Sequence, residues 1–166
     1  MANATQEFNN SIEDTKEAIE QYEQWVYDTL NCADVQIIDA PQYADFDYYV
    51  YVDQYLHHYL EVKTRRHNGG QFNQEKMPIR KHAVAAYFMR EDNIKTIYLV
   101  SWYDQLAILE LWKKPDSVDT MVARYDRGRD KDIYAMYDYS RFKLIKKRQR
   151  PNAPEYKLYQ GRYVRT

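Results

Sequence analysis

Apolar residues recur with helical spacing near the start of the chain. Over residues 11–30, a helix of 100° per residue gathers a stripe of them within an arc of about 80°. The stripe consists of Ile12, Ile19, Tyr22, Val26 and Leu30. Ser11 suits the N-cap, and acidic residues fill the first turn, as the helix dipole favours. Glu23 falls about 20° beyond the stripe. The pattern predicts an amphipathic helix whose Glu23 needs a partner or a metal ion.

Residues 46–64 alternate as a β-hairpin does. In the first arm, one face carries Phe46, Tyr48, Val50 and Val52, and the other carries Asp47, Tyr49, Tyr51 and Asp53. In the second arm, His58, Leu60 and Val62 alternate with His57, Tyr59, Glu61 and Lys63. A turn centred near Gln54 places Asp47 opposite Glu61. The alternation therefore predicts two facing carboxylates, with Lys63 next to them on the same face.

The remaining patterns complete an α/β fold with a mixed central β-sheet flanked by helices. Apolar runs predict a strand over 34–39, two strands over 94–102 and 105–112, and another over 133–145. Pro78 suits the first turn of a helix over 78–92. Residues 65–77, with Gly69 and Gly70, read as a mobile polar loop, and residues 115–130 read as a short helix.

Length and composition favour one intracellular domain. The chain has 166 residues, which is the size of a single domain with its own core. We expect this domain to span 1–145, followed by a basic extension over 146–166 that either packs on the same domain or is a disordered basic end. Cys32 is the only cysteine, which excludes an internal disulfide and favours a reducing, cytoplasmic compartment. No leader pattern or membrane-spanning apolar run is visible, so no membrane association is expected.

Charge is distributed unevenly along the chain. Residues 1–62 hold 13 acidic residues and one basic residue. Residues 63–140 hold 11 acidic and 14 basic residues, and residues 141–166 hold one acidic and nine basic residues. If folding brings the ends together, an acidic pocket lies beside a basic surface. That arrangement can hold a metal ion next to a phosphate backbone. The alternative is that these charges are simply solvated where they fall.

The facing acids of the hairpin are candidate ligands for a metal ion. Two convergent carboxylates suit a hard divalent cation, since Mg²⁺ commonly uses one or two protein carboxylates and keeps several waters. A lysine beside them can orient a water or stabilise negative charge on a phosphate. Asp45 and Asp53 are alternatives to Asp47, because Asp53 shares its face and Asp45 lies close before it.

Asp47, followed after a gap by Glu61-Val62-Lys63, resembles the motif of the PD-(D/E)XK, or restriction-endonuclease-like, nuclease superfamily. Phe46 stands where the motif name has proline. The resemblance implies that Asp47, Glu61 and the main-chain carbonyl of Val62 bind Mg²⁺, with Mn²⁺ as a substitute. It also implies that Lys63 serves the attacking water and that Glu23 is an extra catalytic and metal-binding glutamate.

A phosphodiesterase must surround its acidic site with positive charge. The expected DNA-binding residues are Arg65, Arg66, Lys76, Arg80, Lys81, Lys146, Lys147, Arg148 and Arg150. Members of the resembled superfamily often add a lysine or glutamine near the scissile phosphate, and Lys81, Gln74 and Lys76 are the candidates. His57 is expected near the edge of the site, and Tyr49, Tyr51 and Tyr59 are candidates for stacking on bases. Without cysteine partners, the histidines do not predict a zinc site.

The expected function is Mg²⁺-dependent hydrolysis of DNA by a compact endonuclease of the resolvase, homing or bacteriophage type. A homodimer would supply the two sites needed to cut both strands. One alternative is a DNA-binding module of the same fold with a weak or absent active site. Another is an acidic DNA mimic, against which the basic C-terminal segment argues.

Overall fold

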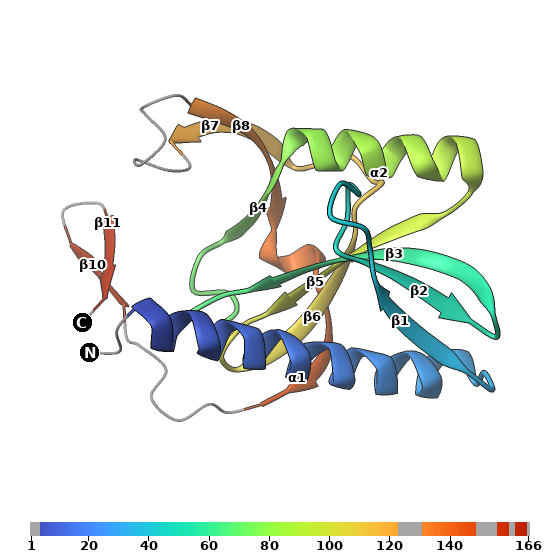
Figure 1. Ribbon diagram of the computed structural model, residues 1–166. Helices are drawn as coiled ribbons and strands as arrows, with labels where there is room; N and C mark the ends of the chain where they lie inside the picture. Colours follow the sequence, from blue (N-terminus) through green and yellow to red (C-terminus); the bar gives the residue numbers. More distant parts are fainter. Residues whose placement is uncertain (1–3, 123–130, 149–155, 160–161, 166) are drawn as a thin grey trace.

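A six-stranded mixed sheet forms the centre of the molecule (Figure 1). The computed structural model describes residues 4–122, 131–148, 156–159 and 162–165. The sheet has the order β1-β2-β3-β5-β6-β9. Its strands are β1 (Val35–Asp39), β2 (Tyr48–Val52), β3 (Tyr55–Thr64), β5 (Lys95–Ser101), β6 (Gln105–Glu110) and β9 (Lys143–Lys147). Only β3 and β5 pair in parallel within this sheet.

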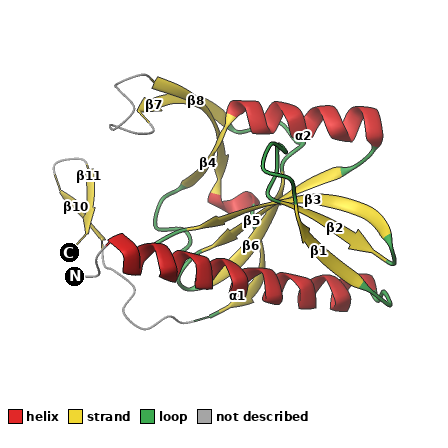
Figure 2. Ribbon diagram, in the orientation of Figure 1, coloured by secondary structure: helices red, strands yellow, loops and turns green. Residues whose placement is uncertain are grey.

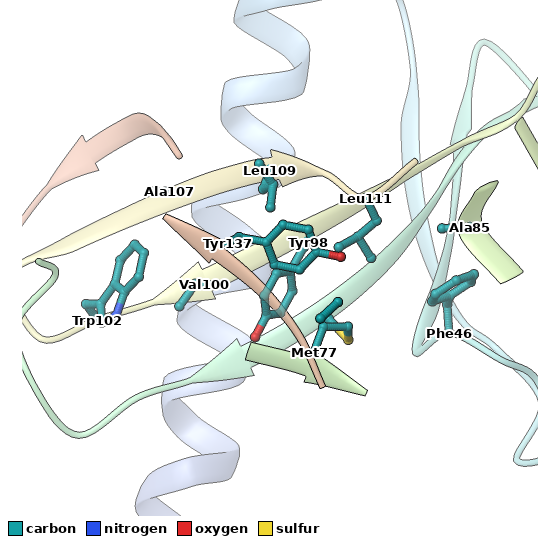
Figure 3. Close-up of a cluster of buried hydrophobic side chains, with 11 residues drawn as sticks. Phe46, Met77, Ala85, Tyr98, Val100, Trp102, Ala107, Leu109, Leu111 and Tyr137 are labelled. Carbon is teal, nitrogen blue, oxygen red and sulfur yellow. The ribbon is translucent and has the colours of Figure 1, made fainter. Parts of the chain in front are cut away.

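Two helices cover opposite faces of the sheet (Figure 2). Side chains of successive residues along β5 point to opposite faces, and they enter two separate cores. Ile97 and Leu99 pack on the side of α1 (Ala4–Leu30), where Tyr22 is buried. Tyr98 and the residues of its face pack on the side of α2 (Ile79–Asp92), in the cluster that Figure 3 shows. The predicted α/β sheet flanked by helices is thereby confirmed.

A second, three-stranded sheet joins the α2 side of the molecule. Its order is β4-β8-β7, made of β4 (Gln74–Pro78), β7 (Ser117–Val122) and β8 (Lys131–Asp138). The polar loop predicted over 65–77 therefore ends in a strand. The short helix predicted from 115 is also wrong, since 117–122 pair with β8; residues 123–130 lie outside the described residues. A short 3₁₀ helix (Tyr139–Arg141) divides the predicted strand 133–145 into β8 and β9.

The C-terminal segment contributes to the central sheet. The predicted boundary between 145 and 146 falls inside β9, so Lys146 and Lys147 belong to the edge of this sheet. Further on, β10 (Tyr156–Tyr159) and β11 (Arg162–Arg165) form a hairpin. Among the described helices, none is long and apolar enough to cross a membrane.

The β2–β3 hairpin combines a tight turn with a bulge. Asp53 and Gln54 form its turn with φ angles of 48° and 73°. Tyr51 pairs with Leu56, whereas Val50 pairs with His58, so His57 is an extra residue in β3. Beyond the bulge, Tyr48 pairs with Leu60. The next positions, 47 and 61, are therefore opposite each other, as predicted.

The bulge and the start of β2 overturn two predictions of the alternation. Phe46 precedes β2 and packs in the core on the α2 side, not with Val50 in the core under α1. His57, expected on the face of Glu61, instead bonds to His58 and lines a cavity with Tyr22 of α1. Both errors arise because strict alternation holds only where a strand is regular.

His58 is a buried titratable group under α1. Its side chain is 4% exposed, its Nε2 lies 2.6 Å from the Tyr22 hydroxyl, and its Nδ1 lies 2.8 Å from Nδ1 of His57. Burial, with smaller effects from His57 and Lys95, lowers the pKa of His58 from 6.5 to about 3. The folded protein therefore holds this imidazole neutral.

We expect His58 to make the fold sensitive to acid. Because its pKa is depressed in the folded state, its stabilising contribution is present above pH 6.5 and is lost as the pH falls toward about 3. The slope should reach up to ~1.4 kcal/mol per pH unit in the free energy of unfolding. Denaturant titrations of wild type and His58→Gln from pH 7 to 4.5 would measure it, because glutamine keeps a hydrogen-bond acceptor for Tyr22. Equal pH slopes in the two proteins would contradict the assignment.

Candidate active site

Asp47 is fixed between two neighbouring strands. Its main-chain carbonyl accepts a hydrogen bond of 2.9 Å from the Ala40 N–H, just after β1. Its side-chain Oδ2 accepts a hydrogen bond of 3.0 Å from the Val62 N–H on β3. The Asp47 carboxylate is thereby held against the Glu61-Val62-Lys63 stretch, as the alternation predicted.

Glu61 provides the buried carboxylate of the site. It is 9% exposed and points to the α2 side, where Lys81 donates a hydrogen bond to its Oε1. Its Oε2 is buried and has no hydrogen-bond partner among the described residues. Burial and then the Asp47 charge raise the pKa of Glu61, while Lys81 partly offsets both. A desolvated oxygen beside a second carboxylate is an unfavourable arrangement that a cation would relieve.

Lysines surround the two acids. Lys63 follows Glu61 by two positions in β3, so it shares the same face. Burial and then the Arg65 charge lower the pKa of Lys63, although Glu61 and Asp47 counteract this. Lys76 of β4 lies 4.9 Å from the centre of the Tyr134 ring. Its pKa is lowered by burial and then by Arg65, with a smaller effect of Lys63. The site therefore combines two carboxylates with the ammonium groups of Lys63 and Lys81, and the Lys63 charge also acts more weakly on Lys76.

The donor set fits a small hard cation. The unpartnered Oε2 of Glu61 and the carboxylate of Asp47 could supply two oxygen ligands, which is a common number for Mg²⁺. Among the described residues, no three histidine, cysteine, aspartate or glutamate side chains gather to hold a metal ion. The predicted role of the Val62 carbonyl stays a prediction.

Glu23 does not join this cluster. It lies on α1, and its neighbour Tyr22 packs into the core on the face of the sheet opposite Glu61. The helical periodicity correctly predicted that Glu23 borders the apolar stripe. Periodicity could not show which face of the sheet that stripe would cover. The prediction that Glu23 joins Asp47 and Glu61 as a third acid of the site is therefore wrong.

The two alternatives to Asp47 have other partners. Asp53 accepts hydrogen bonds of 2.9 Å from the N–H groups of both Ala33 and Asp34, which fixes the end of the hairpin against the α1–β1 connection. Asp45 forms an ion pair of 3.3 Å with Arg80 at the start of α2. Asp47 is the member of the three whose carboxylate reaches the Glu61 strand.

Two arginines expected on the DNA-binding surface are instead internal. Arg65 forms a two-pronged ion pair with Glu75, with its Nε and Nη2 3.0 and 2.7 Å from Oε2 of Glu75. Arg148 has a side chain 7% exposed, and its Nη2 donates to Ser101 Oγ and, at 2.7 Å, to the Trp102 carbonyl. The expectation of phosphate binding by these two residues is corrected. Arg150 lies outside the described residues.

Of the other residues predicted to contact DNA, some are exposed and some have partners within the protein. Arg66, Lys146 and Lys147 are exposed, and Arg80 is too, although it pairs with Asp45. Gln74 donates to Asp138 at 2.8 Å within the smaller sheet.

The tyrosines proposed for base stacking pack against the protein in part. Tyr59 packs against Phe88 with ring centres 4.8 Å apart, and Tyr49 packs on Tyr59 at 5.5 Å. Both rings are half-buried and contact neighbouring aromatic rings, and their stacking on bases stays a prediction.

The sequence analysis missed the network around Glu75. This carboxylate is 5% exposed and also accepts from Trp102 Nε1 at 3.2 Å, while Arg65 donates to the Tyr98 hydroxyl at 3.3 Å. The signal lay in residues 74–78, where Glu75 and Met77 alternate with polar neighbours. Through Arg65, this network links the chain just after Lys63 to Glu75 of β4 and Tyr98 of β5.

Comparison with known proteins agrees with this geometry. A family model described as “Phage putative PDDEXK endonuclease” matches residues 7–145. The matched segment includes Asp47, Glu61 and Lys63. No curated protein and no solved structure gives a significant match.

Proposed function

The chain belongs to this family of phage PD-(D/E)XK endonucleases, and from that premise we propose that it hydrolyses DNA phosphodiester bonds with a divalent cation. The buried, unpartnered Oε2 of Glu61 beside Asp47 is the observation that supports a cation most directly. A buried carboxylate oxygen without a hydrogen bond is costly in a folded protein. The presence of such an oxygen at this position supports a role in catalysis.

Asp47 and Glu61 would hold Mg²⁺, with Mn²⁺ as a substitute and the Val62 carbonyl as a further ligand. When bound, the cation supplies positive charge against the negative charge that develops on the phosphate. The Asp47 carboxylate is oriented for this task by the Val62 N–H, and that of Glu61 is oriented by Lys81. The protein therefore holds both ligands in place before DNA binds.

The lysines act on water and phosphate. Lys63 lies on the face of the two acids, where its ammonium can orient the attacking water toward phosphorus. Lys76 and Lys81 add positive charge around the same point, which favours the approach of the polyanionic backbone. This division of roles agrees with the resemblance in the sequence, with Lys81 as the helix lysine.

Cleavage of labelled DNA tests the function. The substrates are linear duplex, single strand, flap and four-way junction, each with Mg²⁺, Mn²⁺ or EDTA. We expect cutting of at least one substrate with either metal and none with EDTA. Lys63→Ala should remove the cutting, whereas Lys114→Ala, which changes an exposed lysine between β6 and β7, should leave it unchanged.

Failure to cut any substrate, with DNA binding intact in wild type and Lys63→Ala, would overturn the enzymatic proposal. It would instead support a DNA-binding module of this fold. The substrate that is cut fastest would identify the resolvase, homing or phage type of activity, and size-exclusion chromatography would test the predicted homodimer.

A further inference from the structure

A cavity of about 460 Å³ lies between the second half of α1 and the ends of β5, β6 and β9. It is lined by residues of the α1-side core, such as Tyr22, Val26 and Ile97, and by polar residues at its rim. Glu61 faces α2 from the other side of the sheet. The volume is in the range of small-molecule sites, which is roughly 300–1,000 Å³.

Aromatic rings form one wall of this cavity. Trp25 stacks on Tyr22, with ring centres 5.8 Å apart and an interplanar angle of 25°. The Tyr22 hydroxyl is in turn bonded to His58 at 2.6 Å, so the ring that supports Trp25 is itself fixed. The wall is therefore rigid, which lowers the entropic cost of binding a planar group.

The bulge in β3 adds His57 to the same wall. Regular alternation would send His57 to the catalytic face, but the extra residue turns it toward the α1 side, with its Nδ1 2.8 Å from that of His58. Burial and then the Lys95 charge lower the pKa of His57. A neutral imidazole can donate or accept a hydrogen bond with a ligand. Bulges often redirect a side chain at functional sites.

Positive charge exceeds negative charge around the rim. The cavity is lined by Lys95, Lys113, Arg141 and Lys143, against one lining carboxylate, Glu110. Arg141 is neutralised by Asp116 at 3.1 Å, outside the lining. Glu110 is shared between Lys95 at 3.2 Å and Lys113 at 4.0 Å. Lys143 lies 5.4 Å from the centre of the Trp25 ring and has no carboxylate partner among the described residues. The rim can therefore accept an anion.

We propose that this cavity is a nucleotide-binding site, separate from the catalytic acids. A nucleotide combines the planar ring that Trp25 and His57 can contact with the phosphate that Lys113 and Lys143 can neutralise. The same chemistry is presented by a free mononucleotide and by the unpaired end of a nucleic acid strand. The site requires no contribution from Asp47 or Glu61, so its occupancy is independent of cleavage.

Tryptophan fluorescence in EDTA tests the proposal with adenosine monophosphate as the probe. Trp102 is 1% exposed in the other core, and the variant Trp112→Phe removes the remaining tryptophan outside the cavity lining. In that variant we expect saturable quenching of Trp25 with half-saturation below about 1 mM. Adenosine and inorganic phosphate should each bind at least about tenfold more weakly, because each offers half of the contacts.

A pair of charge variants provides the matched control. Lys143→Gln should weaken binding of the nucleotide about tenfold, whereas Lys16→Gln, which changes an exposed lysine of α1 outside the cavity lining, should change it less than about twofold. Unchanged thermal unfolding of both variants would show that the fold is kept. Equal weakening by both would mean non-specific charge attraction and would overturn the site.

A short single-stranded oligonucleotide distinguishes the two sources. Quenching by the mononucleotide supports a free nucleotide, and quenching by the oligonucleotide alone supports a strand end. Absence of quenching by either ligand at about 10 mM would overturn the proposal. Because these titrations contain no metal, they stand whether or not the protein cuts DNA.

Discussion

Glu61→Gln is expected to lower the rate of DNA cleavage roughly 1,000-fold, equivalent to ~4 kcal/mol of transition-state stabilisation. Glutamine keeps the shape of Glu61 but removes the charge that would hold the cation. The fold should be kept or slightly stabilised, because the wild-type carboxylate is buried beside Asp47 with one oxygen unpartnered. Initial cleavage rates at saturating DNA, together with denaturant unfolding, would measure the two effects separately.

Asp45→Asn is the matched control for this result. It neutralises a nearby acid whose partner is Arg80 and not the Glu61 strand. Cleavage should change less than about threefold, since an exposed ion pair contributes little. If Asp45→Asn were as damaging as Glu61→Gln, Asp45 would replace Asp47 in the proposed site. If Glu61→Gln cut DNA at the wild-type rate, the proposed catalytic role of Glu61 would be wrong.

Glu75→Ala is expected to produce the largest loss of stability, about 3–5 kcal/mol in the free energy of unfolding. The change removes a buried carboxylate that pairs with Arg65 and accepts from Trp102. The Arg65 guanidinium would keep its charge in the interior, with the Tyr98 hydroxyl as its remaining side-chain partner within the network. Such an uncompensated charge is costly, as a fall in the denaturant midpoint would show.

Glu91→Ala supplies the comparison for this stability measurement. Glu91 also pairs with an arginine, Arg90, at 2.9 Å, but both side chains are largely exposed. Its removal should change the free energy of unfolding by less than about 1 kcal/mol. Equal effects of Glu75→Ala and Glu91→Ala would contradict the structural role assigned to the Arg65–Glu75 pair.

The Arg65–Glu75 ion pair also fixes a positive charge close to Lys63. Arg65 lies two residues after Lys63, just past the end of β3, and donates to the Tyr98 hydroxyl on the α2 side. After burial, its charge is the next cause that lowers the pKa of Lys63. By binding Glu75, Arg65 is kept as a fixed positive charge near the site and not as a phosphate ligand. Arg65, which was predicted on the DNA-binding surface, is therefore part of the buried framework beside the proposed site.

Much of the site was predictable because it depends on neighbours along two strands. The period of two in residues 46–64 fixes which side chains share a face, and a short turn fixes which positions are opposite. Asp47 and Glu61 were brought together by that information alone. The actual turn lies at Asp53–Gln54, and the bulge shifts the register so that the pairing at Tyr48 and Leu60 is as expected.

Predictions that needed the relative placement of distant elements failed. The alternation of 117–122 was interpreted as a helix, because its pairing partner, β8, follows after an interval of the chain. Arg65 and Arg148 were predicted as surface cations because their partners are distant in sequence. Arg65 pairs with Glu75, and Arg148 donates to Ser101 Oγ and to the Trp102 carbonyl. A charge is exposed or buried according to its tertiary partners, which are not encoded by local spacing.

Periodicity over a few residues is enough to predict the α/β class, the hairpin and the positions of Asp47 and Glu61 opposite each other. The folded structure was needed to place Glu23 on the far face of the sheet, to bring Lys81 to Glu61 and to turn His57 into the cavity under α1. These outcomes depend on which face each helix covers and on one extra residue in β3. Packing of whole elements sets both, because burial of apolar surface is a property of the assembled fold.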